Sequence, residues 1–147
     1  MLYEAVSHDK LKFNKHNSQK DILPNFGLSY KPQTAEYKIN DEYSVLFIKT
    51  KDKNWENYLS RDGLTLYEVP ISGDPEKLQI KSRLLKRITF LNDASSTYGG
   101  GYSFIGVFVL DQSYDWKTDT YPTGKPMLPR LKYNRILDMI DTESFRK

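Results

Sequence analysis

The sequence predicts a mostly β protein of the α+β class, with one mixed or antiparallel sheet and one or two short helices. Aromatic residues make up 14% of the 147 residues, with 11 Tyr and 7 Phe, and such side chains favour strands. Several segments alternate apolar and polar residues between turn signals. The length suits one domain with a sizeable core. We therefore expect a single domain over residues 1–147, with the polar segment 1–41 as a candidate peripheral N-terminal part.

Three segments carry the strand prediction. The first is YSVLFIKT, residues 43–50, and the second is LTLYEVP, residues 64–70, which follows the turn RDG and ends at Pro70. The clearest is 102–110, where alternation places Tyr102, Phe104, Gly106 and Phe108 on one face. Gly106 interrupts that aromatic face, which predicts either a bend or the close approach of another group.

A change of period after residue 73 predicts a short amphipathic helix. Asp74 is a suitable N-cap and Pro75 a suitable first helical residue. Apolar residues between 78 and 88 share one broad arc at about 100° per residue, opposite basic ones. A strand from Arg87 to Leu91 could follow this helix. The closing segment RLKYNRILDMI fits a strand or a helix.

Composition excludes several classes of function. There are no cysteines, so disulfides, thiolate metal sites and a Cys nucleophile are excluded. No motif for a cofactor is present, and none is expected. The apolar runs are too short to span a bilayer and the N-terminus lacks an apolar signal segment, so we expect a cytoplasmic protein. The net charge of +3 says less than its distribution.

The glycine run Gly99–Gly101 raises the question of a phosphate-binding loop. A dinucleotide fingerprint requires a third glycine where Phe104 stands, and a helix where a strand is predicted. A Walker loop requires Gly-Lys-Ser/Thr, but Val107 follows Gly106. Both phosphate interpretations fail, and a turn between two strands is the simpler interpretation.

A small metal-dependent nuclease is one alternative function. It would combine an acidic residue with a downstream Glu-x-Lys to hold a metal and activate water, and Asp21, Glu36 and Lys38 have that order. Surface charges explain the same residues equally simply. No spacing indicates a Ser-His catalytic pair, and we expect a non-catalytic domain.

Basic residues cluster in two places with aromatic residues between them. Five lie between Lys77 and Arg87 without an acidic one, and three more follow the first strand. Such groups suit contacts with DNA phosphates, and flat rings beside them suit a stacked or flipped base. The candidate phosphate contacts are Lys81, Arg83, Lys86 and Arg87, then Lys49, Lys51 and Lys53; the candidate base contacts are Trp55, Tyr58, Tyr67, Tyr98 and Tyr102. A solvated helix face and core aromatics remain the alternative interpretation.

The order of these features resembles a known family. The LFIKT strand, the stretch NYLSRDGLTLYEVPISGD, the basic segment IKSRLLKRI and YSFIGVF follow one another over about half the chain. This is similar to the SRA/PUA-like DNA-reading domains attached to restriction-system nucleases and helicases. The matching positions are Asn57, Ser60, Gly63, Leu84, Leu85, Tyr102, Phe104, Ile105 and Gly106. In this sequence Tyr67 and Glu68 stand where that group often has Trp, and the Gly-Asp-Gln element of the SRA flipping loop is absent.

The resemblance implies a curved, partial-barrel sheet with a groove for duplex DNA and a nuclease or ATPase as a separate domain or subunit. Because the Gly-Asp-Gln element is absent, it does not imply recognition of modified cytosine. The leading hypothesis is a DNA-binding domain of a restriction or defence system. The alternatives are the small nuclease and a protein-interaction module whose aromatic side chains contact a partner chain.

Overall fold

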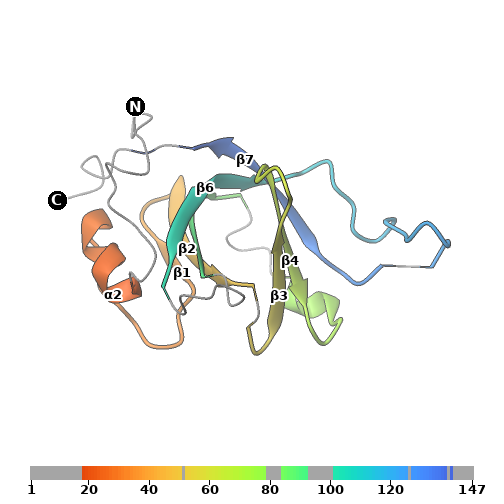
Figure 1. The fold of residues 1–147 in the computed structure, drawn as a ribbon, viewed down its shortest axis with the longest axis horizontal. Coiled ribbons are helices and arrows are strands. Elements are labelled where there is room, and N and C mark those ends of the chain that lie inside the picture. Colours follow the sequence, from red (N-terminus) through yellow and green to blue (C-terminus); the bar gives the residue numbers. More distant parts are fainter. Residues whose placement is uncertain are drawn as a thin grey trace.

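Seven strands form one mixed sheet in the computed structural model, which describes residues 18–50, 52–78, 84–92, 101–125, 127–138 and 140 (Figure 1). The sheet order is β1-β2-β5-β6-β7-β4-β3. The strands are β1 (Glu36–Lys38), β2 (Tyr43–Lys49), β3 (Trp55–Leu59), β4 (Thr65–Pro70), β5 (Lys86–Asn92), β6 (Ser103–Leu110) and β7 (Leu131–Leu137). The mostly β prediction and its strands at 43–50, 64–70 and 102–110 are confirmed, and the closing segment is a strand.

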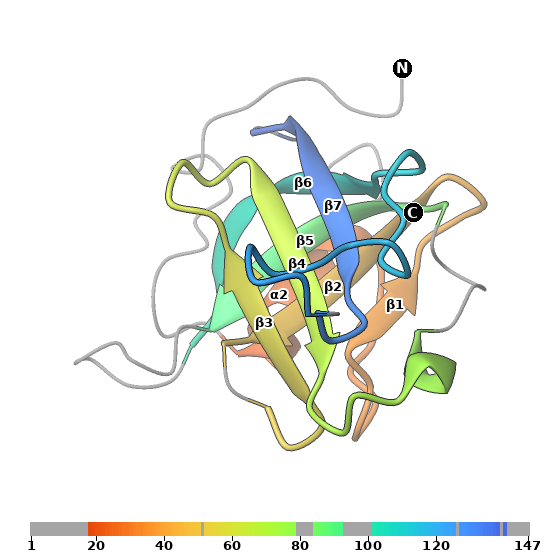
Figure 2. The same cartoon turned by 90° about the vertical axis from the view of Figure 1, so that its right-hand side faces the viewer.

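The sheet curls, so that β3 at one end of the strand order comes close to β2 near the other end (Figure 2). Neighbouring strands are antiparallel except β2 and β5, which run parallel. β3 is not paired with β2 in the sheet, yet Asn57 Nδ2 on β3 donates a hydrogen bond of 2.8 Å to the carbonyl of Lys49 on β2. This contact joins strands from opposite halves of the sheet and confirms the curved, partial-barrel fold.

Strand β2 is buried on both faces and separates two apolar clusters. Its Val45 and Phe47 belong to an outer cluster that includes Phe26, whereas Leu46 and Ile48 pack in an inner cluster with residues of β4, β6 and β7. Because β2 and β4 are not neighbours in the sheet, side chains from both meet only inside the curl. The inner cluster therefore marks the concave face.

The N-terminal part of the described chain covers the outer face. Helix α2 (Gln19–Ile22) begins with a capping box between Ser18 and Asp21, and η1 (Leu23–Phe26) follows it. Ile22, Leu23 and Phe26 are almost fully buried in the outer cluster. The described residues 18–41 therefore contribute several side chains to the outer cluster.

The amphipathic helix predicted after Asp74 is wrong over its described parts. Asp74 does accept a hydrogen bond from the backbone N–H of Glu76, but only the single 3₁₀ turn η2 (Pro75–Lys77) follows. β5 begins at Lys86, and Arg87 and Ile88 alternate along a strand. The pairing of β5 with β2 on one side and β6 on the other outweighs the helical spacing of apolar residues in this segment. Residues 79–83 lie outside the described residues, and no described helix has the length and apolar character needed to cross a membrane.

Gly106 forms a bulge that reverses the faces of β6. Thr89 of β5 pairs with Gly106, whereas the next residue of β5 pairs with Phe104, which leaves one residue of β6 extra. As a result Phe104 packs in the outer cluster and Phe108 in the inner one, and the prediction that they share a face is wrong. Gly106 has a φ of +132°, and a Cβ there would lie 2.8 Å from Nε of Arg135. Both the bend and the close approach predicted from this glycine are present.

Candidate nucleic-acid interface

The β3–β4 hairpin carries a group of polar and aromatic side chains on the concave face. Asn57 pairs with Glu68 across the two strands, and directly opposed side chains lie about 5 Å apart at Cβ on the same face. Trp55, two residues before Asn57, shares that face and packs against the inner cluster while keeping part of its surface exposed. The hairpin thus places an indole ring, an amide and a carboxylate together.

Asn57 has a buried acceptor with no partner. Its side chain is 5% exposed, and Nδ2 donates to the carbonyl of Lys49. Because that carbonyl only accepts hydrogen bonds, the amide orientation is fixed with Oδ1 on the other side. Oδ1 is buried and has no hydrogen-bond partner among the described residues. Leaving such a group unsatisfied costs about 1–3 kcal/mol, so a donor from an ordered water or from a ligand would stabilise this oxygen.

The carboxyl group of Glu68 lies in a cluster of charged and polar groups from other strands. It is hydrogen-bonded to Tyr133 of β7, and it interacts electrostatically with Arg87 and Glu36. Burial raises the pKa of Glu68, although Arg87 and the bond from Tyr133 oppose that rise. Burial likewise raises the pKa of Tyr133, so its hydroxyl remains a donor. The concave face therefore presents a second acceptor beside Asn57.

Arg87 belongs to this internal cluster and is not a surface phosphate contact. It is 2% exposed, its Nε lies 3.2 Å from Oε2 of Glu36, and its guanidinium stacks 4.7 Å from the ring centre of Tyr133. Ser44 donates a 2.6 Å hydrogen bond to the same Glu36 oxygen. The sequence prediction for Arg87 is corrected for this reason: strand alternation turns it toward the inside of the curl.

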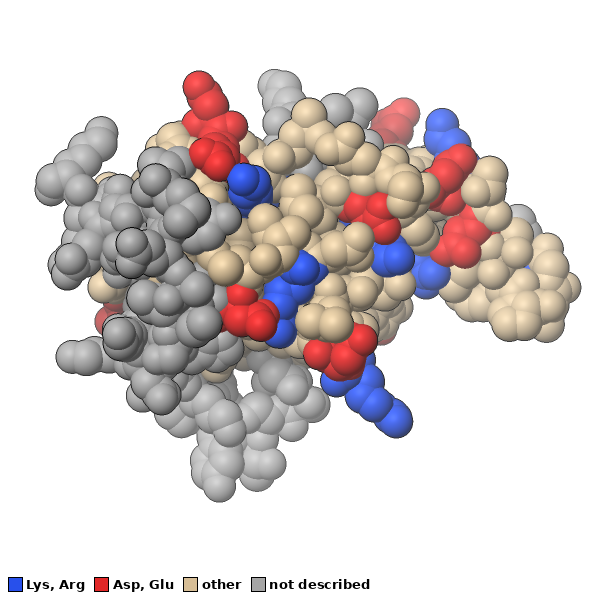
Figure 3. Space-filling view, turned by 90° about the horizontal axis from the view of Figure 1, so that it is seen from above, with Lys and Arg blue, Asp and Glu red and all other residues tan. Residues whose placement is uncertain are grey.

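The other predicted phosphate contacts that the structure describes are Lys49, Lys53 and Lys86. Lys49 and Lys53 are exposed near the start of β3. Lys86 forms an ion pair of 2.9 Å with Glu42. Lys51, Lys81 and Arg83 lie outside the described residues. On the face shown in Figure 3, basic and acidic side chains of the described residues alternate rather than forming one basic patch.

The predicted base contacts divide among three environments. Trp55 lies on the concave face. Tyr58 and Tyr67 pair with each other on the opposite face of the hairpin, where Tyr67 stacks 4.8 Å from the guanidinium of Arg130 and Tyr58 is 43% exposed. Tyr102 is 8% exposed in the outer core, with its ring centre 5.1 Å from that of Phe47. Tyr98 lies outside the described residues. Among the predicted base contacts that the structure describes, Trp55 alone lies with the polar pair.

A comparison with known protein families identifies the family to which this chain belongs. The SET and RING associated (SRA) domain family matches residues 4–142. The chain belongs to the SRA domain family. The absence of a Gly-Asp-Gln element is thus a local departure within the family, because the match extends over nearly the whole chain.

A solved structure shares the SRA fold. It is that of the 5-hydroxymethylcytosine-specific restriction enzyme AbaSI, with a TM-score of 0.60 and 20% sequence identity. The alignment covers 92% of this chain and 42% of the AbaSI chain, so this SRA domain spans less than half the length of that enzyme. No curated protein matches the sequence.

The structure does not bring together the three residues of the alternative nuclease. Asp21 is committed to capping α2. Glu36 points into the concave face toward Arg87, whereas Tyr37 beside it faces α2 through a 3.1 Å hydrogen bond to Gln19. Lys38 pairs with Asp41 at 3.0 Å. Asp21 and Glu36 therefore lie on opposite sides of β1, and the described part of this SRA domain holds no cluster of three potential metal ligands.

Two residues of the concave group were missed by the sequence analysis as site residues. Asn57 entered only through the family resemblance, and Glu68 only as a departure from it. A usable signal was present: both are polar positions on either side of the RDG turn, Asn57 four residues before Arg61 and Glu68 five residues after Gly63, among apolar residues that face the core. Residues placed in this way across a hairpin oppose each other on one face.

Replacing Tyr102 with Ala should destabilise the SRA domain without changing how the folded protein binds DNA. The ring is buried against Phe47, and removing such a side chain costs about 3–5 kcal/mol. Urea unfolding measures the loss, and binding measured well below the unfolding midpoint gives the affinity. A folded variant with weakened DNA binding and unchanged stability would restore Tyr102 to the base-contacting group.

Proposed function

We propose that this SRA domain binds duplex DNA and reads a modified cytosine that has left the base stack, as part of a restriction system. The observation that carries the proposal is the unpartnered Oδ1 of Asn57 beside the Glu68 carboxyl on the concave face. A base within a duplex cannot reach a concave protein surface, so reading it there requires flipping.

The chemistry of the group suits the edge of cytosine. The exocyclic amino group of cytosine is a donor with two hydrogens, and carboxylates are the usual acceptors for it. Asn57 Oδ1 and Glu68 offer two adjacent acceptors, so each hydrogen of the amino group has a partner. Thymine and uracil present a carbonyl oxygen at that position, which would leave the acceptors unsatisfied. Trp55 adds an aromatic surface for stacking.

The relative with a solved structure supports the choice of ligand class. AbaSI is specific for 5-hydroxymethylcytosine, and this chain has its fold over 92% of its own length. We therefore choose 5-hydroxymethylcytosine as the first base to test. Since the chain covers 42% of that enzyme, we propose that the domain itself binds without cleaving and acts with a nuclease or ATPase on another domain or subunit.

Lys49 and Lys53 are the proposed phosphate contacts that remain among the described residues. Both are exposed, and both lie close along the chain to Trp55 and Asn57. The carbonyl of Lys49 also bonds directly to Asn57. This position lets electrostatic contacts with the backbone hold the duplex while the hairpin reads the base. Lys51, Lys81 and Arg83 stay candidates from the sequence.

Replacing Trp55 with Ala is expected to lower the preference for modified DNA. Loss of a stacked ring costs about 1–3 kcal/mol, so affinity for a duplex with one 5-hydroxymethylcytosine should fall about tenfold. Affinity for the unmodified duplex should change much less, because phosphate contacts dominate it. Fluorescence anisotropy with paired duplexes of one sequence measures both. Tyr58→Ala is the matched control, since Tyr58 faces away from Trp55 on the same strand.

Equal binding of modified and unmodified duplexes by the unaltered protein would refute base reading. If neither duplex nor single-stranded DNA binds at about 50 mM salt, the protein-interaction module becomes the leading function. Cleavage of either duplex when Mg²⁺ is added would refute the proposal that the domain only binds.

A further inference from the structure

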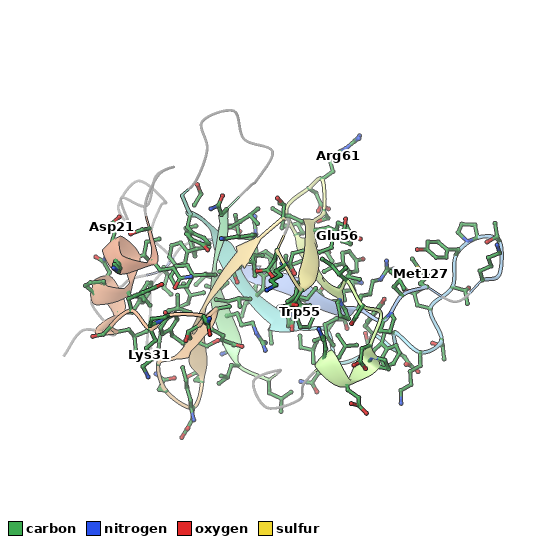
Figure 4. All side chains as sticks on the ribbon, turned by 90° about the horizontal axis from the view of Figure 1, so that it is seen from below. Asp21, Lys31, Trp55, Glu56, Arg61 and Met127 are labelled. Carbon is green, nitrogen blue, oxygen red and sulfur yellow. The ribbon has the colours of Figure 1, made fainter. Side chains whose placement is uncertain are left out.

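The tip of the β3–β4 hairpin is a rigid turn that ends in an exposed arginine. Gly63 donates a backbone hydrogen bond of 2.9 Å to Ser60, and Asp62 accepts 2.6 Å and 3.0 Å bonds from the Ser60 hydroxyl and the Leu64 amide. Arg61 extends from the turn away from the body of the protein (Figure 4). It forms no ion pair with any residue that the structure describes.

A second arginine, Arg135 of β7, lies under this turn in a slot made by two glycines. A Cβ on Gly106 would lie 2.8 Å from its Nε, and a Cβ on Gly63 would lie 2.9 Å from its Nη2. Both glycines have positive φ, +132° and +74°. The backbone amide of Arg135 also donates to the carbonyl of Leu64 at 2.8 Å. One side chain thus connects the bulge in β6 with the tip of the hairpin.

The charges of the other ionic groups at the turn are compensated by neighbouring groups, whereas the charge of Arg61 faces outward. Bonds from Ser60 and Leu64, together with the nearby Arg135, lower the pKa of Asp62, so its carboxylate stays ionised and is compensated inside the turn. Arg135 pairs with Asp138 at 2.7 Å. The guanidinium of Arg61 is free of such compensation and carries a net positive charge at the end of the hairpin.

We propose that Arg61 contacts the DNA backbone about four base pairs from the flipped nucleotide and that Arg135, held between Gly63 and Gly106, is the residue that positions it. The inference rests on the proposed function. Arg61 lies four residues beyond Asn57 on the same hairpin, about 13 Å along an extended chain. At 3.4 Å per base pair, that distance corresponds to about four base pairs, within the same DNA site. Arg61 and the two lysines Lys49 and Lys53 would then hold the duplex on both sides of the reading pair.

The test combines salt dependence with a double-mutant cycle in the full chain. Arg61→Gln should weaken binding to modified and unmodified duplexes by the same factor, about three- to tenfold, and should reduce the slope of log affinity against log salt by about one. The ratio between the two duplexes should stay unchanged. Arg135→Lys keeps the charge but loses the guanidinium contact with Gly63, and should cause a similar loss.

A double-mutant cycle distinguishes a role of Arg135 in positioning Arg61 from a general loss of structure in the Arg135 variant. If Arg135 acts through Arg61, Arg135→Lys has little further effect in the Arg61→Gln protein. Gly63→Ala should resemble Arg135→Lys, because its Cβ meets Nη2. Gly124→Ala is the matched control: its φ is +81°, with nothing within 4 Å of the added atom, so it tests backbone strain alone and should leave affinity unchanged.

Each outcome distinguishes the two proposals. A preference for the modified duplex with an unchanged salt slope in Arg61→Gln would refute this inference and leave base reading intact. Equal losses from Arg135→Lys with and without Arg61 would refute the positioning role. No preference in the unaltered protein, with a reduced slope in Arg61→Gln, would refute base reading and support the backbone contact.

Discussion

Replacing Glu68 with Gln is expected to abolish the preference for modified cytosine while making the folded protein more stable at about pH 8. The substitution exchanges one acceptor oxygen for a donor, so it no longer matches the amino group of cytosine. A matched contact of this kind contributes about 1–3 kcal/mol of discrimination, which corresponds to a loss of about tenfold or more in preference.

The gain in stability follows from the pKa of Glu68. Burial raises that pKa in the folded state above the usual value of 4.5, so the folded protein binds this proton more tightly than the unfolded chain. The contribution of the group to stability is therefore fully present below the usual pKa and declines as pH rises through the folded pKa. Gln does not ionise, and the advantage of Glu68→Gln should shrink toward about pH 4.5.

Thermal unfolding at several pH values, with binding to the two duplexes, measures both effects. Glu56→Gln is the matched control, because Glu56 is exposed and faces away from Asn57 on the same strand. It should change neither stability nor preference. A Glu68→Gln protein that keeps the preference would show that its carboxyl group does not read the base.

Replacing Arg87 with Met is expected to cause a large loss of stability, about 3–5 kcal/mol at about pH 8. Its guanidinium pairs with Glu36 and lies near the Glu68 carboxyl. Removing it takes away the cation that pairs with Glu36 and lies near the Glu68 carboxyl group. Burial raises the pKa of Glu68, so protonation of that carboxyl group lessens the need for the cation and the loss should be smaller at about pH 5.

Urea unfolding at the two pH values measures this dependence. The control is Lys86→Gln, which removes a partly exposed cation and its ion pair with Glu42; such pairs contribute about 0–1 kcal/mol. If the two variants lose similar, small amounts of stability and Arg87→Met instead reduces the salt dependence of DNA binding, Arg87 is a surface phosphate contact after all.

Local sequence patterns were sufficient to predict the strands in which the spacing of apolar residues agrees with the pairing of those strands in the folded sheet. The segments 43–50, 64–70 and 102–110 became strands because apolar faces and turn signals coincide there. The helix predicted after Asp74 was wrong, because the capping residues Asp74 and Pro75 are present but begin only a single 3₁₀ turn. Pairing of β5 with β2, more than 40 residues earlier, decided its later part, and no local pattern contains that information.

The candidate site depends even more on tertiary contacts. Trp55 was identified from its type and its neighbours, but Arg87 and Tyr102 were assigned to a surface that they do not reach. The bulge at Gly106 changes which residues of β6 face inward, so simple alternation failed beyond that point. The unpartnered oxygen of Asn57 is a property of the folded environment, and it is invisible in the sequence.

The place of the β3–β4 hairpin in the chain has an evolutionary consequence. The hairpin lies within the crossover between β2 and β5, the one parallel pair among the described strands, and it joins the sheet at its end, beyond β7. β5, β6 and β7 form the sheet's centre without it. Substitutions at the exposed positions of the hairpin can therefore accumulate while the strand order is preserved. Related domains whose β3–β4 hairpins differ should also differ most in base preference. Exchanging residues 54–71 between two such domains should transfer that preference.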